Sequence, residues 1–247
     1  MPFLSDIRLE DLPASNEHPF SIAAVRALAK TPLPLHPKVT FLVGENGAGK
    51  STLLEAIADK WGFANESGDR DRSPNLRAYS TALAPHLRMA RSIPDRPLDG
   101  FYLRAESLFN FATELDELER EHPNGYFRYG GASLHQQSHG ESFLSLFLHR
   151  FGEHGLYLLD EPEAALSPSR QLTILVRLHD LARAHCQFII ATHSPIIMAY
   201  PDAWIYEISD EGISQVPYED TDHFQITHRF LTHRERMLQQ LLEDEPE

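Results

Sequence analysis

The sequence lacks the features of a secreted or membrane-spanning protein. It contains one cysteine, Cys186, which excludes an intrachain disulfide and a zinc site built from several cysteines. Its longest apolar runs, such as Phe188 to Ala191, fall far short of the roughly 20 residues that a membrane-spanning helix needs. No signal-peptide pattern stands at the start. We therefore expect a cytoplasmic protein with no direct membrane insertion.

Positive charge is also scarce. There are 36 acidic against 22 basic residues, which gives a net charge of -14. Proteins that hold nucleic acid over a large surface are usually basic, because neutralised phosphates release counterions. A local nucleic-acid contact stays open, but the net charge does not indicate one. The 14 histidines are scattered, and none forms the i, i+4 pair with a carboxylate that is typical of a zinc helix.

Apolar strands alternate with stretches of helical periodicity, which predicts an α/β fold with a mostly parallel sheet. After a β-rich start over 1–60, the expected strands are 39–43, 156–159 and 187–191, followed by a hairpin near 204–216. The expected helices are 50–60, 106–122, 134–150, 169–184 and 234–243. Residues 62–100, rich in Arg, Asp, Pro and Ser, are expected to form a mobile surface segment.

A glycine-rich loop follows the first buried strand and fits the pattern G-x-x-x-x-G-K-[ST]. Its glycines let backbone N–H groups turn towards a phosphate, and the helix that follows presents its positive N-terminus. Lys50 would reach the β- and γ-phosphates of ATP, and the Ser51 hydroxyl would ligate Mg²⁺. A chance glycine-rich turn is the alternative, but the strand before the loop and the helix after it supply the required context. The predicted ATP-binding residues are Gly44, Glu45, Asn46, Gly47, Ala48, Gly49, Lys50, Ser51 and Thr52.

Two further motifs stand at strand ends. Asp160 and Glu161 follow the strand 156–159, where phosphoryl transfer needs a carboxylate for the Mg²⁺ shell. Asp160 fits that role, and Glu161, pointing elsewhere, could polarise the attacking water. His193 follows the strand 187–191 and could hydrogen-bond a γ-phosphate. We expect Lys50, Glu161 and His193 to be catalytic.

In this order the motifs resemble those of the ABC-type ATPases. The stretch Ser138-His139-Gly140-Glu141 lies where that family carries its Ser-Gly-Gly-Gln signature, and residues 160–168 are similar to its Asp-Glu-Pro-x-Ser-Ala-Leu-Asp-Pro turn. The resemblance covers nearly the whole chain, and it is strongest to stand-alone bacterial predicted ATPases labelled "AAA family". It implies that Ser138, His139, Gly140 and Glu141 contact the ATP bound by a second copy of the chain.

The sequence departs from the family pattern at several positions. His139 replaces a glycine and Glu141 a glutamine in the signature, and Ser167 replaces the aspartate of the following turn. No glutamine precedes Gln136, so the family's Mg²⁺-sensing glutamine is missing. Glu106 is the expected stand-in as a metal ligand. The alternative is that Glu106 only caps the helix that follows it.

The resemblance implies a single domain over 1–247, with a nucleotide-binding core at 1–61 and 151–247 and an inserted helical lobe at 62–150. We expect an ATPase that uses Mg²⁺, forms an ATP-dependent head-to-tail homodimer and drives a separate protein partner, for example in DNA repair or phage defence. We expect neither a long coiled coil between Lys50 and Ser138 nor an appended nuclease module after Ser194. A transporter ATPase subunit and a non-hydrolysing ATP-gated switch stay open as alternatives.

Overall fold

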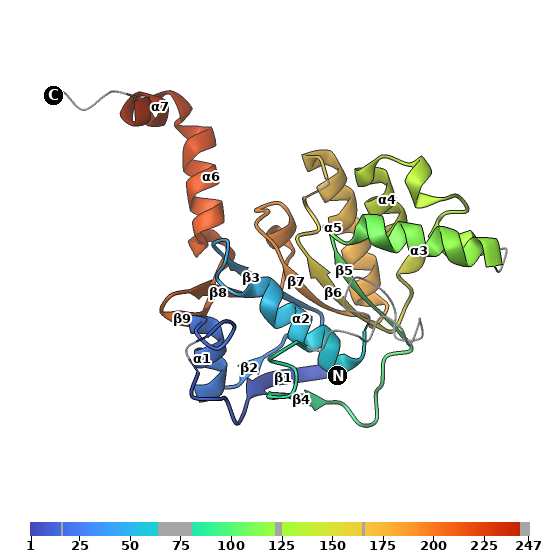
Figure 1. Ribbon diagram of the computed structural model, residues 1–247. Coiled ribbons are helices and arrows are strands. Elements are labelled where there is room, and N and C mark those ends of the chain that lie inside the picture. Colours follow the sequence, from blue (N-terminus) through green and yellow to red (C-terminus); the bar gives the residue numbers. More distant parts are fainter. Residues whose placement is uncertain (16, 64–80, 122–124, 165, 243–247) are drawn as a thin grey trace.

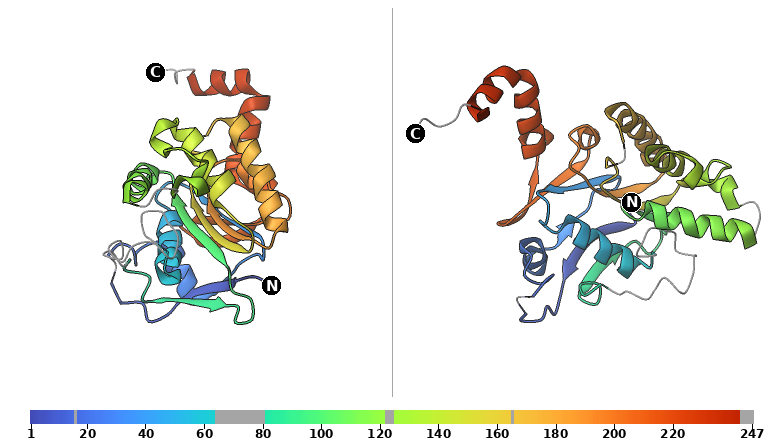
Figure 2. Two further views of the ribbon diagram at one scale, coloured as in Figure 1. Left: turned by 90° about the vertical axis from the view of Figure 1, so that its right-hand side faces the viewer. Right: turned by 45° about the horizontal axis from the view of Figure 1, so that its top comes forward.

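The computed structural model describes residues 1–15, 17–63, 81–121, 125–164 and 166–242. A six-stranded sheet of order β5-β6-β7-β3-β8-β9 forms its centre, and a three-stranded antiparallel sheet of order β2-β1-β4 lies beside it (Figures 1 and 2). The strands are β1 (Leu4–Leu9), β2 (Leu33–Pro34), β3 (Val39–Gly44), β4 (Leu87–Arg91), β5 (Asp99–Arg104), β6 (Gly155–Asp160), β7 (Gln187–Ala191), β8 (Trp204–Ser209) and β9 (Gly212–Val216).

The central sheet is mostly parallel, as the sequence predicts. Among the described residues, strands β5, β6, β7, β3 and β8 pair in parallel, and the edge pair β8–β9 is antiparallel. Parallel strands are covered on both faces, so they read as continuous apolar runs. In β3, the side chains of Phe41 and Val43 enter one core, while Leu42 enters the core on the other face. The carboxyl ends of β3, β6 and β7 therefore meet at one edge of the sheet.

Helices cover both faces of this sheet. Side chains of α3 (Leu108–Glu121), α4 (His139–Ser145) and α5 (Pro168–Arg183) fill the core on one face. Those of α1 (Ala23–Lys30), α2 (Lys50–Trp61) and the small sheet fill the core on the other. The remaining helices are η2 (Gly125–Tyr129), η3 (Leu134–Gln136), η4 (Leu146–Arg150), η5 (Ile197–Ala199), η6 (Tyr218–Asp220), α6 (Asp222–Thr232) and α7 (Arg234–Leu242).

Most of the expected elements are confirmed to within two residues at each end. The helix expected over 134–150 is wrong at its start, since it begins at His139, and the 3₁₀ turn η3 lies before it. Its last turn, η4, has π-helical hydrogen bonding. The sequence analysis missed α1 and α6, which are amphipathic but span only eight and eleven residues, at or below the shortest window over which a helical period is recognised.

The expectation for residues 62–100 is wrong for its second half. Strand β4 pairs with β1, and β5 pairs with β6 as an edge of the central sheet. The polar composition of β4 misled the prediction, because one face of this strand lies on the surface while Leu87 is buried. Residues 64–80 lie outside the described part of the chain. Both strands fall within the 62–150 range assigned to a helical lobe, and the helical part starts at α3.

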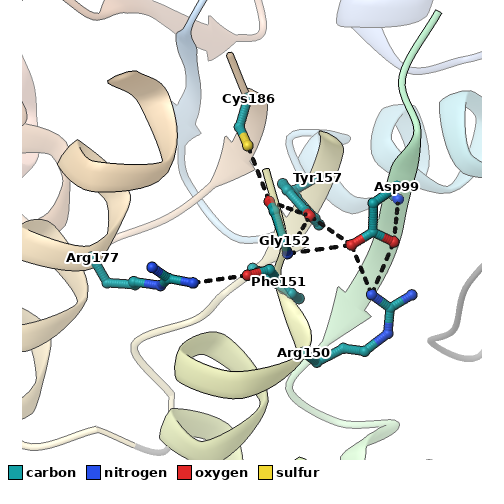
Figure 3. A network of polar contacts seen from close by, with 8 residues as sticks. Asp99, Arg150, Phe151, Gly152, Tyr157, Arg177 and Cys186 are labelled. Carbon is teal, nitrogen blue, oxygen red and sulfur yellow. Dashed lines mark hydrogen bonds and ion pairs between the residues drawn. The ribbon is translucent and has the colours of Figure 1, made fainter. Parts of the chain in front are cut away.

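A buried polar network ties the end of η4 to the starts of β5 and β6 (Figure 3). Both carboxylate oxygens of Asp99 accept from Nη1 of Arg150, at 2.9 and 2.8 Å. The Tyr157 hydroxyl donates to the same carboxylate at 2.9 Å, and the Gly152 N–H lies 3.2 Å from it. This network attaches the lobe that carries the Ser138 stretch to the edge of the central sheet.

The last two helices extend away from the body of the molecule (Figure 1). Neither α6 nor α7 contains a buried residue. In the described part of the chain, no helix combines the length and the apolar character that crossing a membrane requires.

Candidate active site

The glycine-rich loop joins β3 to α2, as its sequence predicts. Gly44 has φ of 138°, and a Cβ there would lie 2.2 Å from the carbonyl oxygen of Ile208. Gly49 has φ of 104°, and its Cβ would lie 2.7 Å from Cγ2 of Ile22. Both positions need glycine for backbone angle and for space. The loop thus packs against the end of β8 and against the segment before α1, and it leads directly into the N-terminus of α2.

Lys50 lies across this loop rather than in solvent. Its ammonium donates to the carbonyl oxygens of Gly44 at 2.8 Å and Glu45 at 2.9 Å, and the residue is 4% exposed. Burial lowers the pKa of Lys50, although the nearby carboxylates of Glu161 and Asp160 act in the opposite direction. A buried ammonium at the centre of a phosphate-binding loop is the expected counter-charge for a polyphosphate.

Ser51 and Asp160 meet, although they are far apart in the sequence. The Ser51 hydroxyl donates to Oδ1 of Asp160 at 3.0 Å. Burial raises the pKa of Asp160 to about 6, against the effects of the Ser51 hydrogen bond and of Arg104. A desolvated carboxylate beside a hydroxyl suits a divalent cation, since Mg²⁺ takes one or two protein oxygens together with phosphates and water. No cluster of three or more His, Cys, Asp or Glu side chains suited to a metal occurs among the described residues.

Glu161 adopts a left-handed backbone angle, with φ of 51°. Its N–H donates to the carbonyl oxygen of Ala191 at 2.9 Å, so this turn is bonded to the end of β7. Its side chain is 42% exposed and lies 3.6 Å from Nε2 of His193. An uncommon angle in a non-glycine residue is often retained at a functional site. The side chain of Asp160 meets Ser51, whereas that of Glu161 lies beside His193.

The backbone and the ring of His193 are each held by a residue that sequence reasoning missed. Oε1 of Glu163 accepts from the His193 backbone N–H, and Oε2 accepts from Thr192 Oγ1 at 2.8 Å. Nδ1 of His193 lies 2.9 Å from Nε2 of His223, in the first turn of α6. Glu163 follows Glu161 by two residues, so its place in the sequence could have indicated that it lies near the site. Nothing in the sequence links His223 to the site.

Among the described residues, Glu106 makes no recorded contact with Ser51 or Asp160. Its side chain is 85% exposed and pairs with Nη2 of Arg104 at 3.3 Å. Arg104 ends β5, lies 3.8 Å from Asp160 and also pairs with Glu55 of α2. The side chain beside the predicted metal ligands is therefore that of Arg104, which the sequence analysis missed because its partners lie in other elements.

The predicted signature stretch lies apart from the glycine-rich loop. Ser138 is the residue before α4. Helix α4 lies beside α3 and away from α2 (Figures 1 and 2). Glu141 accepts from the N–H and the hydroxyl of Ser138, at 3.0 and 2.7 Å, and pairs with Arg170 at 3.1 Å. Ser138 and His139 are exposed, whereas Gly140 is buried. Glu141 thus organises the helix start, which gives a physical reason for a carboxylate at this position.

Two cavities flank the glycine-rich loop. One, of about 650 Å³, is lined by α1, by the β8–β9 turn and by Gly47 and Ala48. The other, of about 720 Å³, is lined by residues 44–48, the end of β8 and the first turns of α6, including His223. Each has the size of a small-molecule site.

A match to a protein-family model shows the family of this chain. The model described as "AAA domain, putative AbiEii toxin, Type IV TA system" matches residues 59–199, which is more than half of the chain. The chain belongs to this family. A second model, described as "AAA domain", matches residues 20–86 and so includes the glycine-rich loop. Membership in this family supports the identification of the chain as an ATP-binding ATPase. Among curated proteins, none matches the chain.

Solved structures share the fold. The chain is similar to cbiO1 of Clostridium perfringens, part of the ABC transporter complex cbiONQ, with 17% identity and a TM-score of 0.52 over 99% of this chain and 100% of that one. It is also similar to an SmcHead bound to the C-winged helix domain of ScpA, with 13% identity and a TM-score of 0.50 over 87% and 98% of the two chains. At such identities the likeness shows the fold alone. The fold is that of ABC-type P-loop ATPases.

Proposed function

We propose that this chain binds ATP with Mg²⁺ on the loop at Gly44–Ser51 and hydrolyses it. The observation that carries the proposal is the 3.0 Å contact between Ser51 and Asp160, which joins the loop to the carboxylate at the end of β6. Lys50 neutralises the β- and γ-phosphates, and Ser51 and Asp160 hold the ion. Bound Mg²⁺ supplies a positive charge that offsets the developing charge on the phosphate oxygens.

In this proposal Glu161 orients and polarises the attacking water. Its carboxylate is partly exposed, beside His193, and is bonded to neither Ser51 nor Lys50 by any contact recorded among the described residues. His193 donates a hydrogen bond to the terminal phosphate. The loop glycines hold the phosphate chain through backbone N–H groups, and Thr52 follows them in the first turn of α2.

Since Ser138 lies away from its own loop, the proposal includes a second copy of the chain. Ser138, His139, Gly140 and Glu141 of one copy would complete the site of the other, in a head-to-tail homodimer that ATP closes and hydrolysis opens. The dimer would drive or regulate a separate protein partner. The family's description names a toxin of a type IV toxin–antitoxin system, which favours a partner in cellular defence over one in transport.

The test compares two variants of the full chain with matched controls. Lys50→Ala should abolish ATP binding measured by calorimetry. Glu161→Gln should keep binding and lower kcat ~100-fold or more, as expected for loss of a general base. Lys38→Ala and Glu153→Gln change exposed residues of the same types at the far ends of β3 and β6. Unimpaired hydrolysis in Glu161→Gln would contradict the proposed role, and absence of hydrolysis in the unaltered protein would favour a non-hydrolysing switch.

A further inference from the structure

The rings of His193 and His223 share one hydrogen bond. Nδ1 of His193 and Nε2 of His223 lie 2.9 Å apart, and the ring centroids are 5.0 Å apart. At this distance one nitrogen carries a proton and the other accepts it. The two remaining ring nitrogens, Nε2 of His193 and Nδ1 of His223, are buried without a hydrogen-bond partner in the described part of the chain.

The surroundings decide which ring donates. Nε2 of His193 faces the Glu161 carboxylate at 3.6 Å. If Nδ1 of His193 were the donor, a neutral ring would turn the lone pair of Nε2 towards this carboxylate, which is repulsive. If Nε2 of His223 is the donor, His193 presents Nε2–H to the carboxylate, which is attractive.

Both rings favour the neutral form that this arrangement needs. Burial lowers the pKa of His193, and the charge of Lys50 and the second ring lower it further, while Glu161 opposes them. Burial and Lys50 likewise lower the pKa of His223. Each ring is therefore neutral near neutral pH and carries one proton, which lies on either Nδ1 or Nε2.

The segment that carries His223 is fixed to the same edge of the sheet. The Tyr218 hydroxyl donates to the carbonyl oxygen of Pro195, two residues after His193, at 2.8 Å. Thr221 is fully buried; its hydroxyl donates to the Tyr218 carbonyl at 2.8 Å and accepts from the Phe224 N–H at 3.3 Å. The first turn of α6 is thus held in place although the rest of this helix is exposed.

We propose that His223 is a positioning residue, whose Nε2–H donates to Nδ1 of His193 and keeps the proton of His193 on Nε2. This inference rests on the proposed function, because a proton on Nε2 makes His193 a donor to the terminal phosphate beside Glu161. It also makes the first turn of α6 part of the ATP site. Without His223, the Glu161 carboxylate at 3.6 Å still favours Nε2–H, but the share of the Nδ1–H tautomer, which cannot donate from Nε2, rises.

The tautomer is measured directly by nitrogen-15 NMR of labelled histidines in the full chain without nucleotide, with His193→Gln to assign the signals. The unaltered protein should show His193 with a protonated Nε2 and an unprotonated Nδ1. His223→Ala should give a mixture of tautomers. A protonated Nδ1 in the unaltered protein, or an unchanged His193 signal in His223→Ala, would overturn the inference. This readout does not depend on hydrolysis, so it stays informative if the chain proves not to be an ATPase.

Kinetics supply the second readout. His223→Ala should lower kcat about tenfold, the usual scale for loss of a residue that orients an active-site group, with the Kd of ATP unchanged. His223→Gln, whose carboxamide N–H can donate to the same Nδ1, should recover most of kcat. His233→Ala, at the exposed end of α6, is the matched control. Equal losses in His223→Gln and His223→Ala would count against positioning through a donated hydrogen bond.

Discussion

Glu163 holds the backbone at the carboxyl end of β7. Its two carboxylate oxygens accept separately from Thr192 Oγ1 and from the His193 N–H. Burial raises the pKa of Glu163, and these donors partly oppose the rise. A group that anchors the loop bearing His193 affects the site without itself touching a phosphate.

Replacement of Glu163 by glutamine tests this anchoring. A carboxamide offers one acceptor oxygen in place of two, so one buried donor loses its partner. We expect Glu163→Gln to lower the free energy of unfolding by about 1–3 kcal/mol, the usual cost of such a loss, and to lower kcat. Urea unfolding and steady-state hydrolysis measure the two effects. Glu153→Gln, at an exposed loop, should change neither; equal stability of both variants would refute the anchoring role.

At the scale of elements, the Asp99 network fixes the helical lobe to the central sheet. Burial alone would raise the pKa of Asp99, but the charge of Arg150 and hydrogen bonds from Arg150, Tyr157 and Gly100 outweigh it and hold the pKa below its ordinary value. The Arg150 side chain is 2% exposed, and its Nη1 lies 2.8 Å from Oδ2 of Asp99. The network thereby connects the Ser138 stretch to β5 and β6.

We expect Asp99→Asn to lower the free energy of unfolding by about 3 kcal/mol at pH 7, because it removes the carboxylate charge that faces the buried Arg150 guanidinium at 2.8 and 2.9 Å. Since the pKa is depressed in the folded state, the stabilisation is complete above the unfolded pKa of about 3.9 and is lost as the pH falls through the folded value. The difference between the two proteins should therefore shrink below about pH 4. Thermal unfolding across pH checks this, with the exposed Asp180→Asn as control. A difference independent of pH would exclude the charge as its origin.

For the whole molecule, the separation of Ser138 from the loop at Gly44–Ser51 makes the proposed site depend on two chains. Variant Glu161→Gln should accumulate the ATP-bound form, because binding is kept and turnover is lost. Light scattering with size-exclusion chromatography should then give twice the 28.1 kDa mass in the presence of ATP and Mg²⁺.

Adding Ser138→Arg to Glu161→Gln should return the protein to a monomer while ATP binding by calorimetry is unchanged. The exposed Ser214→Arg on β9 is the matched control and should leave the dimer intact. A Glu161→Gln protein that binds ATP and stays monomeric would reject the head-to-tail dimer without affecting the nucleotide site.

The sequence alone determined the fold class and the two strand-end motifs. Strands such as β3 and β6 are buried on both faces, so a short continuous apolar run identifies them in the sequence. The loop at Gly44–Ser51 needs glycine at positions that the local backbone geometry sets. The order of these motifs was enough to place Ser51 and Asp160 at one edge of the sheet.

Only the tertiary structure decided which other side chains complete that edge. His223, Arg104 and Glu163 reach the site from α6, from the end of β5 and from the turn after β6. Glu106, which the sequence favoured, points to solvent beside Arg104. The physical reason is that side-chain contacts between distant elements depend on register and packing, whereas a motif depends on the chemistry of consecutive residues.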